Sequence, residues 1–263
     1  MLVDDRHARA VGQAFRRMAS LCGGASVDDE GLLLYRTATP QPIVWNGALV
    51  VTESLPAAEV VRRSDEFFAA EGRDYGFWVL GRRDASLVDA LAAVGAELVS
   101  DDPHMSLDLD GVEPTMTADV ELELVTDAGG RERFVQIASR SFEVLGVAPA
   151  TWELVYPSVA AVTQDDVITV VAVDRGVPLA GAMGYLDGEI CELIHVGTDP
   201  SARRRGLGAA VTMAVMSHAK HRGATEAILQ ATHEGEGVYR RIGFRELERY
   251  RLYLRSTAQL HGA

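Results

Sequence analysis

Residues 189–208, EICELIHVGTDPSARRRGLG, carry the strongest local signals in the chain. They start with an apolar run over residues 190–196, which is typical of a buried strand, and turn at Asp199 and Pro200. Arginines and glycines fill residues 203–208, and a long segment with an apolar stripe follows. The first turn of a helix has backbone N–H groups without intrahelical partners, and the helix dipole adds partial positive charge there. The stretch therefore predicts a strand, a loop and a helix N-terminus that form an anion site, most often for phosphate.

A second pattern, VYRRIGF, follows this helix at residues 238–244. The two patterns together resemble the GNAT N-acetyltransferase superfamily. Arg203-x-x-Gly206-x-Gly208 is similar to the family's acyl-CoA pyrophosphate motif, (Gln/Arg)-x-x-Gly-x-(Gly/Ala), and residues 238–244 are similar to its helix ending in LYxxxGF. The alternative for the first pattern is an ordinary strand-to-helix crossover with a glycine-rich turn. A dinucleotide-binding site is disfavoured, because no Gly-x-Gly-x-x-Gly opens a helix here.

The elements predicted for residues 118–263 follow the order β-α-α-β-β-β-α-β-α-β, which is the order of the GNAT fold. Apolar periodicity, hairpin signals and helix-ending glycines define them. The resemblance implies an α/β (α+β) fold class with a mixed, mostly antiparallel central sheet flanked by helices. The expected strands cover residues 120–125, 167–173, 179–186, 190–196, 227–231 and 250–254, and the expected helices cover 131–142, 149–156, 206–221 and 237–242.

The first half of the chain is expected to be a second, degenerate GNAT-like domain. Residues 110–114 are the expected linker, so the two domains would cover residues 1–114 and 115–263. When the helix-ending glycines of the two halves are aligned, Leu91 stands where the second half has Tyr239, and no Arg-x-x-Gly-x-Gly precedes Pro56. An unrelated α/β cap is the alternative. The expected helices cover residues 6–20, 56–70 and 86–95, and the expected strands cover 32–35, 48–51, 75–80 and 105–109.

Composition bounds the compartment and the partners of the protein. The 263 residues suffice for one large or two small domains, and the net charge of −13 disfavours general binding to nucleic acid or to a membrane surface. The acidic balance suits a cationic substrate such as an amine, although solubility alone explains it too. Cys22 and Cys191 are expected to be reduced thiols of a cytoplasmic protein. No signal peptide, transmembrane run or cluster of metal ligands is recognised.

The resemblance implies transfer of an acetyl group from acetyl-CoA to an amine. In the family, backbone N–H groups at the start of the helix bind the pyrophosphate, and the preceding strand pairs with the pantetheine arm. The arginines of the loop add charge-assisted hydrogen bonds to phosphate, or else form a solvated basic turn. The residues expected to bind the donor are Val196, Arg203, Arg204, Arg205, Gly206, Leu207, Gly208 and Ala209.

Two residues are the expected catalytic groups, by their places in the family pattern. Tyr239 would protonate the departing thiolate, or else only pack against the cofactor. Glu192, on the strand before the phosphate loop, would be the base, on the same strand face as Ile194 and Val196. His195 on the opposite face and a chain of water molecules are the rivals of Glu192. Trp152 and Tyr185 are weaker candidates for the acceptor pocket.

Several functions remain open from the sequence. The leading one is an N-acetyltransferase acting on a primary amine of a small molecule. The alternatives are a regulatory or interaction module that binds acyl-CoA with little catalysis, and a protein lysine acetyltransferase. The protein would be a monomer or a homodimer, and no residue identifies the acceptor.

Overall fold

The computed structural model describes residues 5–52, 55–110, 112 and 120–259, which form two compact units. Unit 1 takes in the described residues of Met1–His104, Gln230–His233 and Glu246–Ala263. Unit 2 takes in those of Met105–Leu229 and Glu234–Arg245. Two strands, β5 (Glu97–Asp108) and β11 (Arg245–Arg255), therefore begin in one unit and end in the other.

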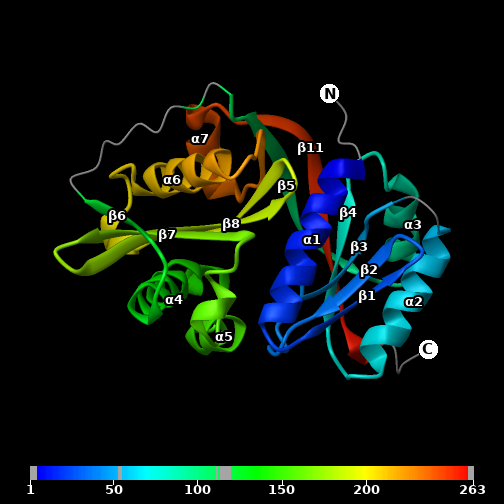
Figure 1. Ribbon diagram of the computed structural model, residues 1–263. Coiled ribbons are helices and arrows are strands. Elements are labelled where there is room, and N and C mark those ends of the chain that lie inside the picture. Colours follow the sequence, from blue (N-terminus) through cyan, green and yellow to red (C-terminus); the bar gives the residue numbers. More distant parts are fainter. Residues whose placement is uncertain (1–4, 53–54, 111, 113–119, 260–263) are drawn as a thin grey trace. The chain divides into compact units, whose positions relative to one another are not determined.

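Unit 1 is a sheet with helices on both faces (Figure 1). Strands β1, β2 and β3 pair antiparallel, β3 and β4 pair parallel, and β4 pairs antiparallel with β11. Side chains alternate between the two faces of each strand, so Tyr35 stacks on Phe15 of α1 at 4.5 Å while Leu34 joins the core under α2 and α3. The elements are α1 (Asp5–Leu21), β1 (Ala25–Asp29), β2 (Leu32–Arg36), β3 (Asn46–Val50), α2 (Ala57–Ala69), β4 (Tyr75–Leu80) and α3 (Ala85–Ala93).

Unit 2 repeats this plan with a longer antiparallel meander. Strands β6 to β9 pair antiparallel in sequence, and β9 pairs parallel with β10. Helices α4 and α6 cover opposite faces: Gly181 of β8 lies against Phe134 of α4, and Gly184 lies against Val215 of α6 (Figure 1). The elements are β6 (Glu121–Leu124), α4 (Ala128–Phe142), α5 (Pro149–Val155), β7 (Val167–Asp174), β8 (Val177–Asp187), β9 (Ile190–Thr198), α6 (Leu207–His221), β10 (Glu226–Gln230) and α7 (His233–Ile242).

The predicted fold class and element order are confirmed. The sequence analysis missed β1, an edge strand whose one large apolar side chain, Val27, is 44% exposed. Within the described residues, no helix combines the length and the apolar composition needed to cross a membrane.

The compact units do not follow the expected division into residues 1–114 and 115–263. Residues 246–255 belong to unit 1, because β11 pairs with β4 from Tyr250–Leu80 to Arg255–Tyr75. The expected linker falls mostly on residues outside the described ones. The assignment of the first half as a degenerate GNAT-like domain stays a prediction.

Candidate active site

The loop after β9 is fastened by one buried carboxylate. Asp199 accepts hydrogen bonds from the backbone N–H of Ser201 at 2.9 Å and from its hydroxyl at 2.6 Å. Arg140 of α4 donates to the same carboxylate at 3.2 Å. The Ser201 hydroxyl, followed by the backbone N–H of Ser201 and by Arg140, lowers the pKa of Asp199 despite its burial. The turn is therefore tied to α4 before the chain enters α6.

The N-terminus of α6 leaves backbone donors open. Gly206 precedes the helix with a φ of 79°, a left-handed conformation that glycine adopts at no steric cost. The first intrahelical hydrogen bond of the turn runs from the N–H of Ala210 to the carbonyl of Gly206 at 3.0 Å. The N–H groups of Leu207, Gly208 and Ala209 come before it and lie in the positive end of the helix dipole. This is the geometry that binds a phosphate.

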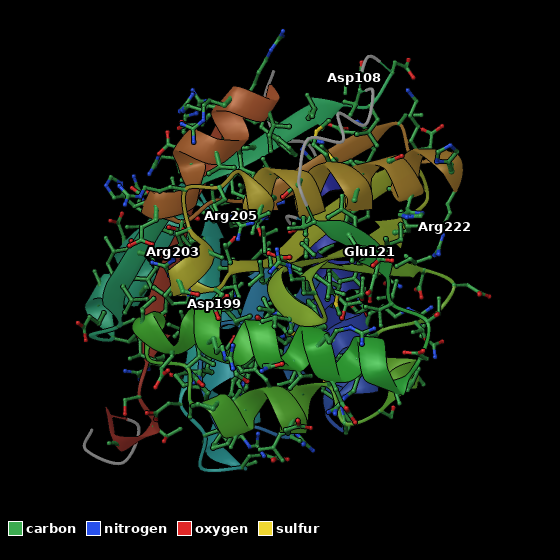
Figure 2. All side chains as sticks on the ribbon, turned by 90° about the vertical axis from the view of Figure 1, so that its left-hand side faces the viewer. Asp108, Glu121, Asp199, Arg203, Arg205 and Arg222 are labelled. Atoms are coloured by element: carbon green, nitrogen blue, oxygen red, sulfur yellow. The ribbon has the colours of Figure 1, made fainter. Side chains whose placement is uncertain are left out.

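The three arginines before α6 are exposed. Figure 2 shows two of them, Arg203 and Arg205. Arg203 lies 4.0 Å from Glu234 and Arg205 lies 3.8 Å from Asp174, both at the limit of an ion pair. Exposed pairs of this kind stabilise a fold by little, so a phosphate can displace their carboxylates. Arg204 has a φ of 64°, which makes the loop left-handed at a second position.

The pairing of β9 with β10 ends several residues before β9 itself ends. Their parallel pairing joins Ile190 to Glu226, Cys191 to Ala227 and Glu192 to Ile228. In the described residues β9 then continues to Thr198 without further pairs to β10, so its backbone there is open to another partner. Val196 lies in this part of β9, and its pairing with an extended ligand stays a prediction.

A β-bulge in β9 corrects the predicted strand faces. Met183 pairs with Ile194 and Gly181 pairs with Gly197, so three residues of β9 span the length of two in β8. Glu192 and Ile194 share the face of α4, but after the bulge Gly197 takes this face instead of Val196. The expectation that Glu192 and Val196 share a face is therefore wrong, because a bulge shifts the alternation by one residue.

The bulge also turns His195 toward the face of Glu192, contrary to the prediction that they lie on opposite faces. His195 has a φ of 50°, and its Nδ1 lies 2.6 Å from the hydroxyl of Tyr156, just after α5. Its ring meets those of Trp152 and Phe142, on α5 and α4. Burial lowers the pKa of His195 to about 3.

Glu192 and Tyr239 are both buried, to 2% and 9% exposure. Glu192 pairs across the strands with Tyr185, and Tyr239 of α7 packs edge-on against Phe244. Burial raises the pKa of Tyr239. Trp152 and Tyr185 are also buried, at 1% and 2% exposure, and their place in an acceptor pocket stays a prediction.

Tyr156 is the residue that sequence reasoning missed. It lies far from His195 in sequence, and only the fold brings the two together. One signal was available: Trp152 and Tyr156 are four residues apart, which places both on one face of a helix.

Comparisons with known proteins find a matching family model and similar folds. Residues 132–244 match the model of the acetyltransferase (GNAT) family. A GCN5-related N-acetyltransferase from Kribbella flavida shares the fold with a TM-score of 0.75 and 22% identity, over 97% of this chain and 96% of that one. A GCN5-related N-acetyltransferase from Sphaerobacter thermophilus has a TM-score of 0.62 and 14% identity, over 97% and 94% of the two chains. A tandem GNAT protein from the clavulanic acid biosynthesis pathway has a TM-score of 0.58 and 14% identity, over 97% of both chains. No curated protein matches the chain in sequence.

Proposed function

We propose that the protein acetylates a primary amine of a small molecule, because residues 132–244 match the model of the GNAT acetyltransferase family. Acetyl-CoA is the acyl donor, and the amine attacks its thioester carbonyl directly. The observation that carries this proposal is the open N-terminus of α6, with the left-handed Gly206 and three exposed arginines before it. Backbone donors, a helix dipole and positive side chains together suit a pyrophosphate.

The proposed donor site uses both the loop and the free part of β9. The N–H groups of Leu207, Gly208 and Ala209 bind the pyrophosphate. The backbone of Val196 pairs with the pantetheine arm as an added strand would. Replacing Gly208 is informative, because the neighbour that a Cβ there would approach is the Thr198 hydroxyl, at 3.3 Å.

The proposed reaction needs two proton transfers. As the new C–N bond forms and the C–S bond breaks, Glu192 accepts the proton that the amine loses, and Tyr239 donates a proton to the departing thiolate. Burial makes Tyr239 a weaker acid, but the same desolvation makes a thiolate beside it a stronger base. His195 is a poor candidate for the base, since its pKa of about 3 leaves it with little tendency to take up a proton.

Net charge and the two cysteines support proposals about the acceptor, the compartment and the oligomeric state. A net charge of −13 favours approach of a cationic amine through long-range attraction. Cys22 and Cys191 are buried free thiols, which fits a reducing, cytoplasmic compartment and a monomer or homodimer without disulfide links. Unit 1 would be a degenerate partner domain without an acyl-CoA site of its own.

The test is an amine panel assayed by release of the CoA thiol from acetyl-CoA. We expect turnover with at least one small primary amine, loss of that turnover in Glu192→Gln, and no comparable rate with lysine-bearing proteins. Acetyl-CoA binding without turnover of any amine would instead favour the regulatory module. Faster reaction with protein lysines would favour the protein acetyltransferase.

A further inference from the structure

His195 is held in an unusual conformation at the bulge of β9. A residue other than glycine with a φ of 50° is uncommon, and such conformations persist where the surroundings hold them in place. The hydroxyl of Tyr156 lies 2.6 Å from Nδ1 of His195, which is a short hydrogen bond. Two independent features, the backbone and this bond, therefore fix the direction of one imidazole ring.

Aromatic side chains support the ring from behind. The centroids of Trp152, Tyr156 and Phe142 lie 5.0, 5.8 and 6.2 Å from that of His195, all close to edge-on. Trp152 is 1% exposed and Tyr156 is 0% exposed, whereas His195 is only partly buried. Buried aromatic side chains thus hold one partly exposed polar ring in place, which is how a recognition residue is built.

The protonation state limits what this side chain can do. Because burial lowers its pKa to about 3, the imidazole is uncharged near neutral pH. It can donate or accept hydrogen bonds but adds no positive charge to attract an acid group. Glu192, buried on the same sheet face, supplies no positive charge either.

We propose that His195 binds the acceptor of the acetyl group, that Tyr156 positions His195, and that the pair selects amines without a neighbouring acid group. This assignment rests on the proposed acetyltransferase function and names its substrate class. An apolar primary amine fits the uncharged imidazole and the aromatic surroundings. The same molecule with a carboxylate beside the amine meets no counter-charge from His195 or from Glu192.

Phenethylamine and phenylalanine form the matched probe pair, since they differ by one carboxylate. We expect the wild-type protein to prefer phenethylamine by at least about tenfold in kcat/KM, the cost of about one unmatched polar contact. Tyr156→Phe should raise the KM for phenethylamine by about tenfold, with kcat and the KM for acetyl-CoA nearly unchanged. His195→Asn, which tolerates the left-handed backbone, should raise it at least as much.

Tyr35→Phe is the matched control, because it removes the hydroxyl of another buried tyrosine, which donates to the carbonyl of Ile43 at 2.8 Å in unit 1. It should leave every kinetic constant unchanged. If the wild-type protein acetylates the two probes with equal kcat/KM, this assignment is wrong. It is also wrong if Tyr156→Phe leaves the KM for phenethylamine unchanged. Neither result contradicts the proposed acetyltransferase function. A wild-type protein that acetylates no amine overturns both.

Discussion

The hydroxyl of Tyr239 separates a catalytic role from a packing role. Tyr239→Phe keeps a ring that is buried to 9% exposure and packs against Phe244 at 5.8 Å, but it removes the proton donor. We expect turnover to fall roughly 10²-fold while acetyl-CoA affinity stays nearly constant, which is the usual effect of losing one general acid. Turnover and calorimetric affinity, measured side by side with the best amine, check this.

The control for this change is again Tyr35→Phe, whose hydroxyl lies in unit 1. It should lower stability slightly and leave turnover intact. Equal turnover in wild type and Tyr239→Phe would show that water or another group supplies the proton. A loss of affinity alone would reduce Tyr239 to a packing residue.

At the scale of residues, local patterns predicted some positions and not others. Gly206 and Tyr239 stand in short motifs whose meaning depends only on neighbours in sequence, so their places were predictable. The orientations of His195 and Val196 were not, because a bulge is set by the pairing of β9 with β8 and inverts the faces beyond it. The contact of His195 with Tyr156 has the same cause, since the bulge turns the ring toward α5.

Helix α6 is the element on which donor binding depends. Gly208→Asp places a carboxylate among the N–H groups that would meet the pyrophosphate, and like charges repel there. Acetyl-CoA should raise the melting temperature of the wild-type protein through binding linkage and should not shift that of the variant. Thermal unfolding with and without acetyl-CoA measures both shifts.

Gly129→Asp is a matched control for this helix. It adds the same charge in the first turn of α4, where a Cβ would lie 3.5 Å or more from its neighbours. The ligand-induced shift should survive in this variant. If acetyl-CoA also raised the melting temperature of Gly208→Asp, the assignment of the donor site to α6 would be wrong.

In unit 1, side chains of the protein itself bond to the backbone at the end of the parallel pair β3–β4. The guanidinium of Arg83 donates to the backbone carbonyls of Val50 and Val51 at the end of β3. It also bonds to Asp84 at 2.8 Å, and this carboxylate accepts from the N–H of Leu80 in β4 at 2.9 Å. Backbone groups that could pair with an extended ligand are thus used by the chain itself.

Unit 1 should therefore bind no acyl-CoA. Calorimetry on the full chain should give one acetyl-CoA per protein, and Gly208→Asp should abolish all binding, because unit 1 offers no second site. Residual binding of stoichiometric acetyl-CoA in Gly208→Asp would contradict this expectation, as would density for a second cofactor in a crystal.

The whole molecule should lose stability in mild acid because each unit holds a histidine that is uncharged in the folded state. Burial and the nearby His7 lower the pKa of His104 in unit 1 to about 3, and burial does the same to His195 in unit 2. The unfolded chain then binds more protons than the folded one between about pH 6.5 and pH 3. Stability is fully present above this window and falls as the pH drops through it.

Urea unfolding from pH 6 to pH 4.5 measures this effect. The slope for one such histidine is about 1.4 kcal/mol per pH unit, so His104→Gln should flatten the curve by about that amount. His233→Gln, at an exposed position of α7, should leave the slope unchanged. An unaltered slope in His104→Gln would mean that His104 is already protonated in the folded protein.

At the largest scale, the compact units differ from the domain boundary that the sequence predicted. Each half has its own strand and helix periodicity, and that is a local property. The placement of β11 depends on pairing with β4, and the two strands are separated by most of the chain. Arg255 contributes a contact of the same long range, since it bonds to Asp65 of α2 at 3.1 Å.

The pairing of β11 with β4 also means that β4 is synthesised long before its partner strand. Ribosomes add about 5 to 20 residues per second, so a nascent chain that has just completed residue 104 waits roughly 8 to 30 s for residue 255. During that time the edge of Tyr75–Leu80, six residues that are all buried in the finished protein, has no partner strand. An unpaired apolar edge is a template for aggregation. Holding chaperones, and the rate at which the second half is translated, should therefore govern how much of this protein a cell recovers in folded form.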